Sequence, residues 1–143
     1  MKTLNQIKHD LINFFEGHAI INQVVYSNDF EFNAERELNY PVANIEYLES
    51  NMNGKLTTHS YSIILADLYD NSLKGHSDEI HSDMLLIAED FFSWAQEEDG
   101  FLFNKAANIQ KFIDDADDRT AGIVLKFQLA TMRSQNSCAI PFL

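Results

Sequence analysis

Residues 77–96 read SDEIHSDMLLIAEDFFSWAQ and carry the clearest periodic pattern in the chain. Apolar residues recur there at steps of three and four, which places them along one side of a helix; they are Ile80, Met84, Ile87, Ala88, Phe91, Trp94 and Ala95. Ser77 is the predicted N-cap, and Gly100 follows soon after the last periodic residue. Full burial of the larger side chains, at roughly 1.5–3 kcal/mol each, contributes on the order of 10 kcal/mol. The rest of the chain must therefore cover this helix.

The apolar sector of this helix is wider than one sheet contact needs, because Leu85 and Phe92 extend it. We expect a second helix or a neighbouring subunit to touch this flank. Residues 3–16 supply the second helix, since their apolar residues also follow a helical step and Gly17 ends the pattern.

Strand patterns occupy most of the remaining sequence. Residues 19–26 form a β-branched run, and residues 41–69 form a long β-hairpin around the turn at Asn53-Gly54. Residues 109–132 form a second hairpin, whose return strand alternates apolar and polar residues from Ile123 to Leu129. Residues 28–39 are expected to be a loop, with a helical turn near 34–38. The order of elements predicts an α+β fold: a mostly antiparallel sheet, two helices packed on one face and a long hairpin arm.

Length and composition indicate one domain spanning residues 1–143. The chain is 45% hydrophobic, and its formal net charge is -12 with ten scattered Lys and Arg residues. Tight nucleic-acid binding is not expected, because phosphate contacts need clustered cations. A single cysteine, Cys138, excludes an internal disulfide, and neither a membrane span nor a signal peptide is predicted.

The densest group of possible metal ligands lies at residues 75–83. His76 and His81 are five residues apart, whereas ligands on one side of a helix need spacings of three or four. Asp78 and His81 have a workable spacing of three, but two ligands do not make a site. Helix capping and a solvated surface explain this cluster better than a metal does.

Two further candidate sites are the acidic run at residues 114–118 and Cys138. The acidic run at residues 114–118 lacks the ligand spacing of a calcium loop, because Arg119 and Thr120 stand where a ligand and a glycine are needed. Cys138 could act as a nucleophile with a histidine, but nothing in the sequence brings the two together. Phosphate-binding and hydrolase glycine motifs are absent. We therefore predict no catalytic, cofactor-binding or metal-binding residues and no enzymatic activity.

A resemblance to a known family rests on the order of elements and on a few short signatures. These are the N-terminal helix, Tyr40-Pro41 before the long hairpin, Asp67-x-x-Asp70 after it, the helix 77–96, the acidic hairpin and Cys138-Ala139-Ile140-Pro141. Together they resemble tail-terminator or head-to-tail connector ring proteins of tailed bacteriophages. The resemblance implies a virion structural protein, assembled in the host cytoplasm, that forms a hexameric or dodecameric ring. Portal, neck or tail proteins would be its neighbours, and DNA would pass through the lumen without specific contact.

The residues themselves also favour assembly, because the wide helix face, the long hairpin and the apolar tail expose more apolar surface than a monomer needs. The predicted inter-subunit contacts are Ile45, Tyr47, Asn53, Gly54, Tyr61, Ile140, Phe142 and Leu143, the last three within a docking tail at residues 136–143.

The alternative function is that of a small acidic protein that mimics nucleic acid and inhibits a host DNA-binding protein. Such a mimic needs carboxylates along one face at phosphate-like spacing, and here apolar positions interrupt the acids. A hydrolase or metal enzyme with a hidden site ranks third.

Overall fold

The computed structural model describes residues 2–26, 38–70, 72–103, 107–114 and 120–132. Two helices lie in these ranges, α1 (Leu4–Glu16) and α3 (His76–Glu97). The strands are β1 (Gln23–Tyr26), β2 (Val42–Asn53), β3 (Leu56–Leu68), β4 (Leu102–Phe103), β5 (Asn108–Asp114) and β6 (Thr120–Met132).

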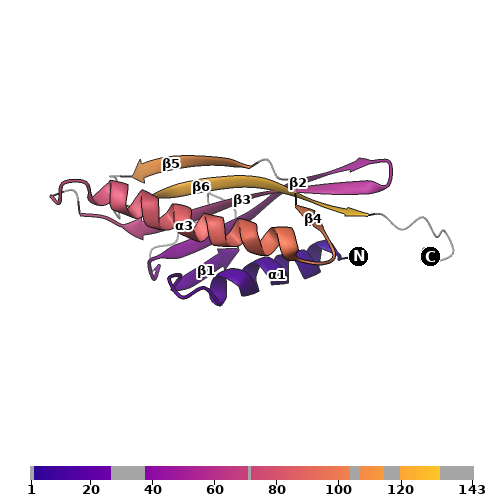
Figure 1. Cartoon of the computed structure of the whole chain (residues 1–143), viewed down its shortest axis with the longest axis horizontal. Coiled ribbons are helices and arrows are strands. Elements are labelled where there is room, and N and C mark those ends of the chain that lie inside the picture. Colours follow the sequence, from indigo (N-terminus) through magenta and orange to yellow (C-terminus); the bar gives the residue numbers. More distant parts are fainter. Residues whose placement is uncertain (1, 27–37, 71, 104–106, 115–119, 133–143) are drawn as a thin grey trace.

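These strands form one sheet in the order β1-β2-β3-β6-β4, and β5 also pairs with β6. Every pairing is antiparallel except that of β1 with β2, which is parallel. Both helices cover the same face of the sheet (Figure 1). The structure thus confirms the predicted α+β class, the mostly antiparallel sheet, the two helices on one face and the long hairpin.

The helix boundaries agree closely with the periodic patterns. At the start of α1, the Thr3 side chain accepts a hydrogen bond from the backbone N–H of Gln6, and the Gln6 side-chain oxygen accepts one from the backbone N–H of Thr3. This reciprocal pair is a capping box. The predicted N-cap of α3 was wrong: the cap is Gly75, which has a left-handed φ of 78°, and no side chain caps the helix. Because α3 begins at His76, Ser77 already lies inside its first turn.

The core of the domain is an aromatic cluster centred on Phe91 of α3. The Phe91 ring centroid lies 5.5 Å from that of Phe15 on α1 and 4.9 Å from that of Phe127 on β6. Trp94 on α3 stacks on Phe14 of α1 at 5.0 Å, so α1 covers the Trp94 side of α3. The flank widened by Leu85 and Phe92 is not covered by α1: Leu85 is 39% exposed, and the Phe92 ring lies 5.4 Å from that of Phe103 on β4. The cluster joins both helices to the centre of the sheet.

The strands differ from expectation in two places. Within the predicted run 19–26, only Gln23–Tyr26 is strand, because the Ile20 amide donates instead to His18 Nδ1 in the bend that follows α1. The two-residue strand β4 was not predicted, since two residues are too few to show a period. The predicted loop at 28–39 lies outside the described residues except at positions 38 and 39.

Candidate inter-subunit surface

The distal part of the β2–β3 hairpin, residues 49–59, projects beyond the ends of both helices (Figure 1). We call this segment the arm. Asn53 pairs with Leu56 across a two-residue turn made by Gly54 and Lys55, in which Gly54 has a φ of 60°. A positive φ at the first turn residue suits glycine and matches the twist of the two strands. The predicted hairpin and its turn are therefore confirmed.

A β-bulge separates the arm from the body of the sheet. The pairing register between β2 and β3 shifts between Tyr47 and Glu49, so that Ser50 lies opposite His59. Ser50 Oγ is hydrogen-bonded to the Tyr47 hydroxyl and lies 2.6 Å from His59 Nδ1. Burial lowers the pKa of His59, which favours its neutral form. This polar contact fixes the base of the arm to the sheet.

The arm presents apolar side chains to solvent. Residues 49–56 are all exposed, and Met52 exposes 70% and Leu56 37% of its surface. Met132 lies directly opposite Leu56 on β6 and is 58% exposed. Leu48, at the bulge, is also exposed. Leu56 and Met132 therefore form an exposed apolar pair on one face of the arm, and Met52 is exposed on the other face.

The residues predicted as inter-subunit contacts occupy different environments. Asn53 and Gly54 lie at the exposed tip of the arm, and Tyr47 is half-buried at its base. Ile45 and Tyr61 were wrong as contacts, because both are 0% exposed within their own chain. They point to the sheet face that the helices cover. Ile140, Phe142 and Leu143, and with them the docking tail 136–143, lie outside the described residues.

Tyr61 instead belongs to a buried aromatic group beneath the arm. Its ring stacks on Phe127 at 5.7 Å and lies 5.6 Å from the ring of Tyr47. Its hydroxyl finds no hydrogen-bond partner of acceptable geometry in the described part of the chain. Burial, together with the neighbouring Tyr26 and Tyr47, raises the pKa of Tyr61. The hydroxyl is therefore protonated and held in an apolar environment.

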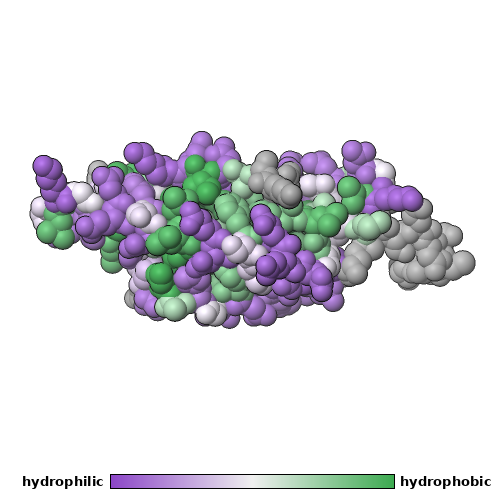
Figure 2. All heavy atoms as spheres, viewed as in Figure 1, coloured by the Kyte–Doolittle hydropathy of each residue, from purple (hydrophilic) through white to green (hydrophobic). Residues whose placement is uncertain are grey.

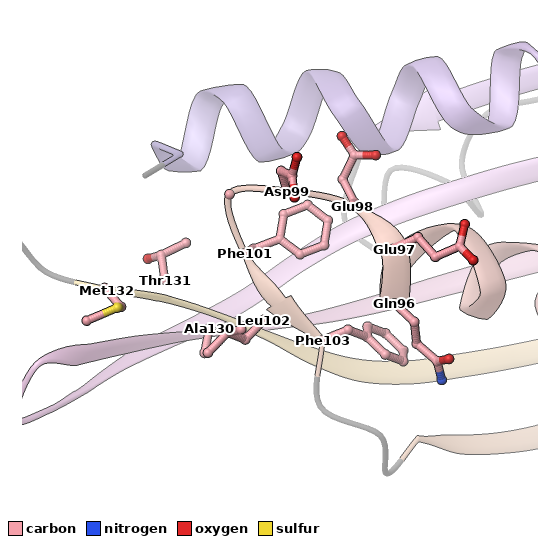
Figure 3. Close-up of a pocket in the computed structure, with 11 residues that line it drawn as sticks. Gln96, Glu97, Glu98, Asp99, Phe101, Leu102, Phe103, Ala130, Thr131 and Met132 are labelled. Carbon is pink, nitrogen blue, oxygen red and sulfur yellow. The ribbon is translucent and has the colours of Figure 1, made fainter.

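An open cavity of about 720 Å³ lies between the end of α3, β4 and the end of β6, where residues 130–132 pair with residues 56–58 of the arm (Figure 3). We call it the base pocket. Its apolar lining comes from Phe101, Leu102, Phe103, Ala130 and Met132, and its acidic lining from Glu97, Glu98 and Asp99. This pocket was not predicted from the sequence. The one available signal was the acidic stretch 97–99 directly before Gly100 and the apolar triplet 101–103.

One edge of the base pocket already binds a lysine of the same chain. Lys2 Nζ lies 3.1 Å from Glu98 Oε1, pairs with Asp10 and sits 5.4 Å from the centroid of the Phe101 ring. A Cβ at position 100 would meet the Lys2 side chain at 2.6 Å, and Gly100 has a φ of 95°. Glycine at position 100 therefore allows Lys2 to pack over this turn.

The two histidines of the segment 75–83 have structural partners. His76 Nδ1 accepts a hydrogen bond of 2.8 Å from the Asp70 amide, and His81 Nε2 lies 3.0 Å from the Phe112 carbonyl oxygen. His81 thereby joins α3 to β5. No group of three or more potential metal ligands converges within the ranges that the structure describes. Asp115, Asp117, Asp118 and Cys138 lie outside those ranges.

No protein-family model matches this chain, and no curated protein matches its sequence. Neither helix in the described residues is long and apolar enough to cross a membrane.

Proposed function

We propose that the chain is a non-enzymatic structural subunit of a closed ring in the head-to-tail or tail-terminator assembly of a tailed bacteriophage. The ring joins the portal or neck to the tail, and DNA passes through its lumen. The family resemblance in element order supports this proposal, and the observation that carries it is the projecting arm with its exposed apolar side chains.

The arm supports assembly on energetic grounds. Each Met or Leu side chain that becomes fully buried contributes about 1.5–3 kcal/mol, so Met52 on one face of the hairpin and Leu56 on the other each offer about that much to a subunit contact. A head-to-tail contact repeats around a ring and closes when the rotation between subunits divides a full turn. One arm per subunit is enough to build such a ring of six or twelve copies.

The charge of α3 supports passage of DNA without adhesion. All six acidic residues of the helix are exposed, and its 22 residues include no Lys or Arg; the acids are Asp78, Glu79, Asp83, Glu89, Asp90 and Glu97. Figure 2 shows hydrophilic residues interspersed with apolar ones on the helix-bearing side of the molecule. In a ring whose lumen is lined by α3, these carboxylates repel DNA phosphates.

Portal, neck and tail proteins are the proposed neighbours of the ring, and DNA is the molecule that passes through it. The proposed location is the neck or tail of the virion, after assembly in the cytoplasm of the bacterial host. No cofactor is proposed.

The acidic row on α3 also favours the second candidate, an acidic inhibitor that mimics nucleic acid. The exposed side chains of Leu85 and Leu86 interrupt that row, and a mimic gains nothing from an apolar arm. An inhibitor is expected to act as a monomer or dimer that binds a host DNA-binding protein.

Light scattering over a wide concentration range, followed by negative-stain imaging, distinguishes the two functions. The ring proposal predicts closed particles of six or twelve subunits. A chain that remains monomeric at high concentration and is retained on a host DNA-binding protein supports the inhibitor instead.

A further inference from the structure

We propose that the tip of the arm, residues 52–56, inserts into the base pocket of a second copy of this chain. This inference rests on the proposed ring and names the surface that receives each arm. It joins two different surfaces, the tip and the pocket, and a ring forms when each copy receives its arm from one neighbour and gives its own arm to another.

Charge complementarity is the first argument. Lys55 at the tip of the arm is the only Lys or Arg between residues 37 and 73. Of the residues that the structure describes, three acidic ones and no Lys or Arg line the base pocket. Glu97 and Asp99 are exposed and form no ion pair with any described residue. A cation brought to this rim therefore gains attraction that the isolated subunit leaves unused.

Apolar complementarity is the second argument. Met52 and Leu56 flank the turn, and the pocket offers Leu102, which is 61% exposed, together with Met132 and the partly buried Phe103. The cavity of about 720 Å³ falls within the range of about 300–1,000 Å³ typical of pockets that enclose a ligand. Its size therefore suits a few side chains of a hairpin tip.

The same corner already binds a lysine within the subunit. Lys2 lies between two carboxylates, Asp10 and Glu98, and over the Phe101 ring. Carboxylates beside an aromatic ring bind an ammonium group through charge and cation–π attraction. We infer that Lys55 of the second copy lies at Asp99, whose side chain points to a different side of Glu98 than that of Glu97 (Figure 3).

Disulfide cross-linking between two chains that differ in size tests this contact and leaves Lys55, Glu97 and Asp99 unchanged. One chain carries Asn53→Cys at the tip, and a second, size-tagged chain carries Gln96→Cys in the pocket; both also carry Cys138→Ser. After mixing and mild oxidation of the assembled protein, a disulfide between the two chains is expected. The matched control replaces Gln96→Cys with Lys111→Cys, exposed on β5, and is expected to give little cross-linked product.

Charge reversal gives a second readout on the full chain. Lys55→Glu alone and Asp99→Lys alone are each expected to raise the assembly midpoint concentration about tenfold, and the double reversal in one chain is expected to restore most of the loss.

The outcomes separate this inference from the proposed function. Two results would overturn the inference and leave the ring proposal intact. One is an assembled protein that gives no more cross-link than the Lys111→Cys control, and the other is a double reversal that restores no assembly. A wild-type chain that never assembles overturns the ring proposal itself and the inference with it.

Discussion

Lys2 Nζ lies 3.1 Å from Glu98 Oε1 and thereby joins the start of α1 to the turn that follows α3. Burial acts to lower the pKa of Lys2, but its hydrogen bonds to Asp10 and Glu98 outweigh this effect and the pKa is raised. The ion pair is partly buried and lies beside the base pocket. It therefore contributes both to stability and to the shape of the pocket rim.

Replacing Lys2 by methionine tests this contribution, because Lys2→Met keeps the apolar stem and removes the charge. We expect a loss of about 1 kcal/mol in the free energy of unfolding, as for a charge-assisted contact that is only partly buried. Urea denaturation measures the change. Lys74→Met, on the exposed segment before α3, is the matched control, and an equal loss in both variants would contradict the assigned role.

Gly122 on β6 is required by close packing against β3. A Cβ at this position would lie 1.9 Å from the Leu65 carbonyl oxygen, which is backbone and cannot rotate away. We expect Gly122→Ala to force the strands apart and to cost roughly 2–3 kcal/mol, the upper part of the range for overpacking. Thermal denaturation followed by circular dichroism measures this cost. An unchanged midpoint would show that the sheet adjusts without strain.

His59 makes stability dependent on pH. Burial lowers its folded pKa from the usual value of 6.5, so the unfolded chain takes up a proton more readily. The stability gained from neutral His59 is therefore fully present above about pH 6.5 and is lost as the pH falls through 6.5 toward the lower folded value. Urea midpoints measured between about pH 7.5 and pH 5.5 should fall for wild type and fall less for His59→Gln. Identical slopes in the two proteins would disprove this assignment.

Tyr61→Phe removes a buried hydroxyl that makes no well-formed hydrogen bond among the described residues. Leaving such a group unsatisfied costs about 1–3 kcal/mol, so we expect the variant to be as stable as wild type or more stable by about 1 kcal/mol. Phe91→Ala, at the centre of the aromatic cluster, is the contrasting core change and should cost about 3–5 kcal/mol. A clear loss of stability in Tyr61→Phe would show that its hydroxyl is bonded, most simply to Tyr26.

The sequence predicted the helices and both hairpins well because these elements are long enough to show their periods. Thirteen residues in α1 and 22 in α3 display a complete apolar side, and Asn53-Gly54 is a specific turn signal. Shorter or non-local features were missed. β4 has only two residues, too few to show a period. β1 pairs in parallel with β2, and the residue pattern of neither strand indicates which strand it pairs with.

The candidate site was predicted only in part, for a similar reason. Alternation in the hairpin shows which residues share a face, but it does not show whether a helix of the same chain or a neighbouring subunit covers that face. Ile45 and Tyr61 were therefore assigned to a contact although they lie in the core. The base pocket combines residues 96–103 with residues 130–132, and these ranges meet through the pairing of β4 with β6 and the packing of α3 on β6.

The central claim is that apolar side chains on the arm drive assembly, and one comparison tests it most directly. Met52→Asp places a charge on the exposed apolar surface of the arm, and Asn51→Asp places the same charge one residue away without removing an apolar group. The molar mass of each purified protein is measured by light scattering at concentrations where wild type forms rings. The account predicts that Asn51→Asp assembles like wild type and that Met52→Asp remains a folded monomer. Rings formed equally by both variants would contradict it.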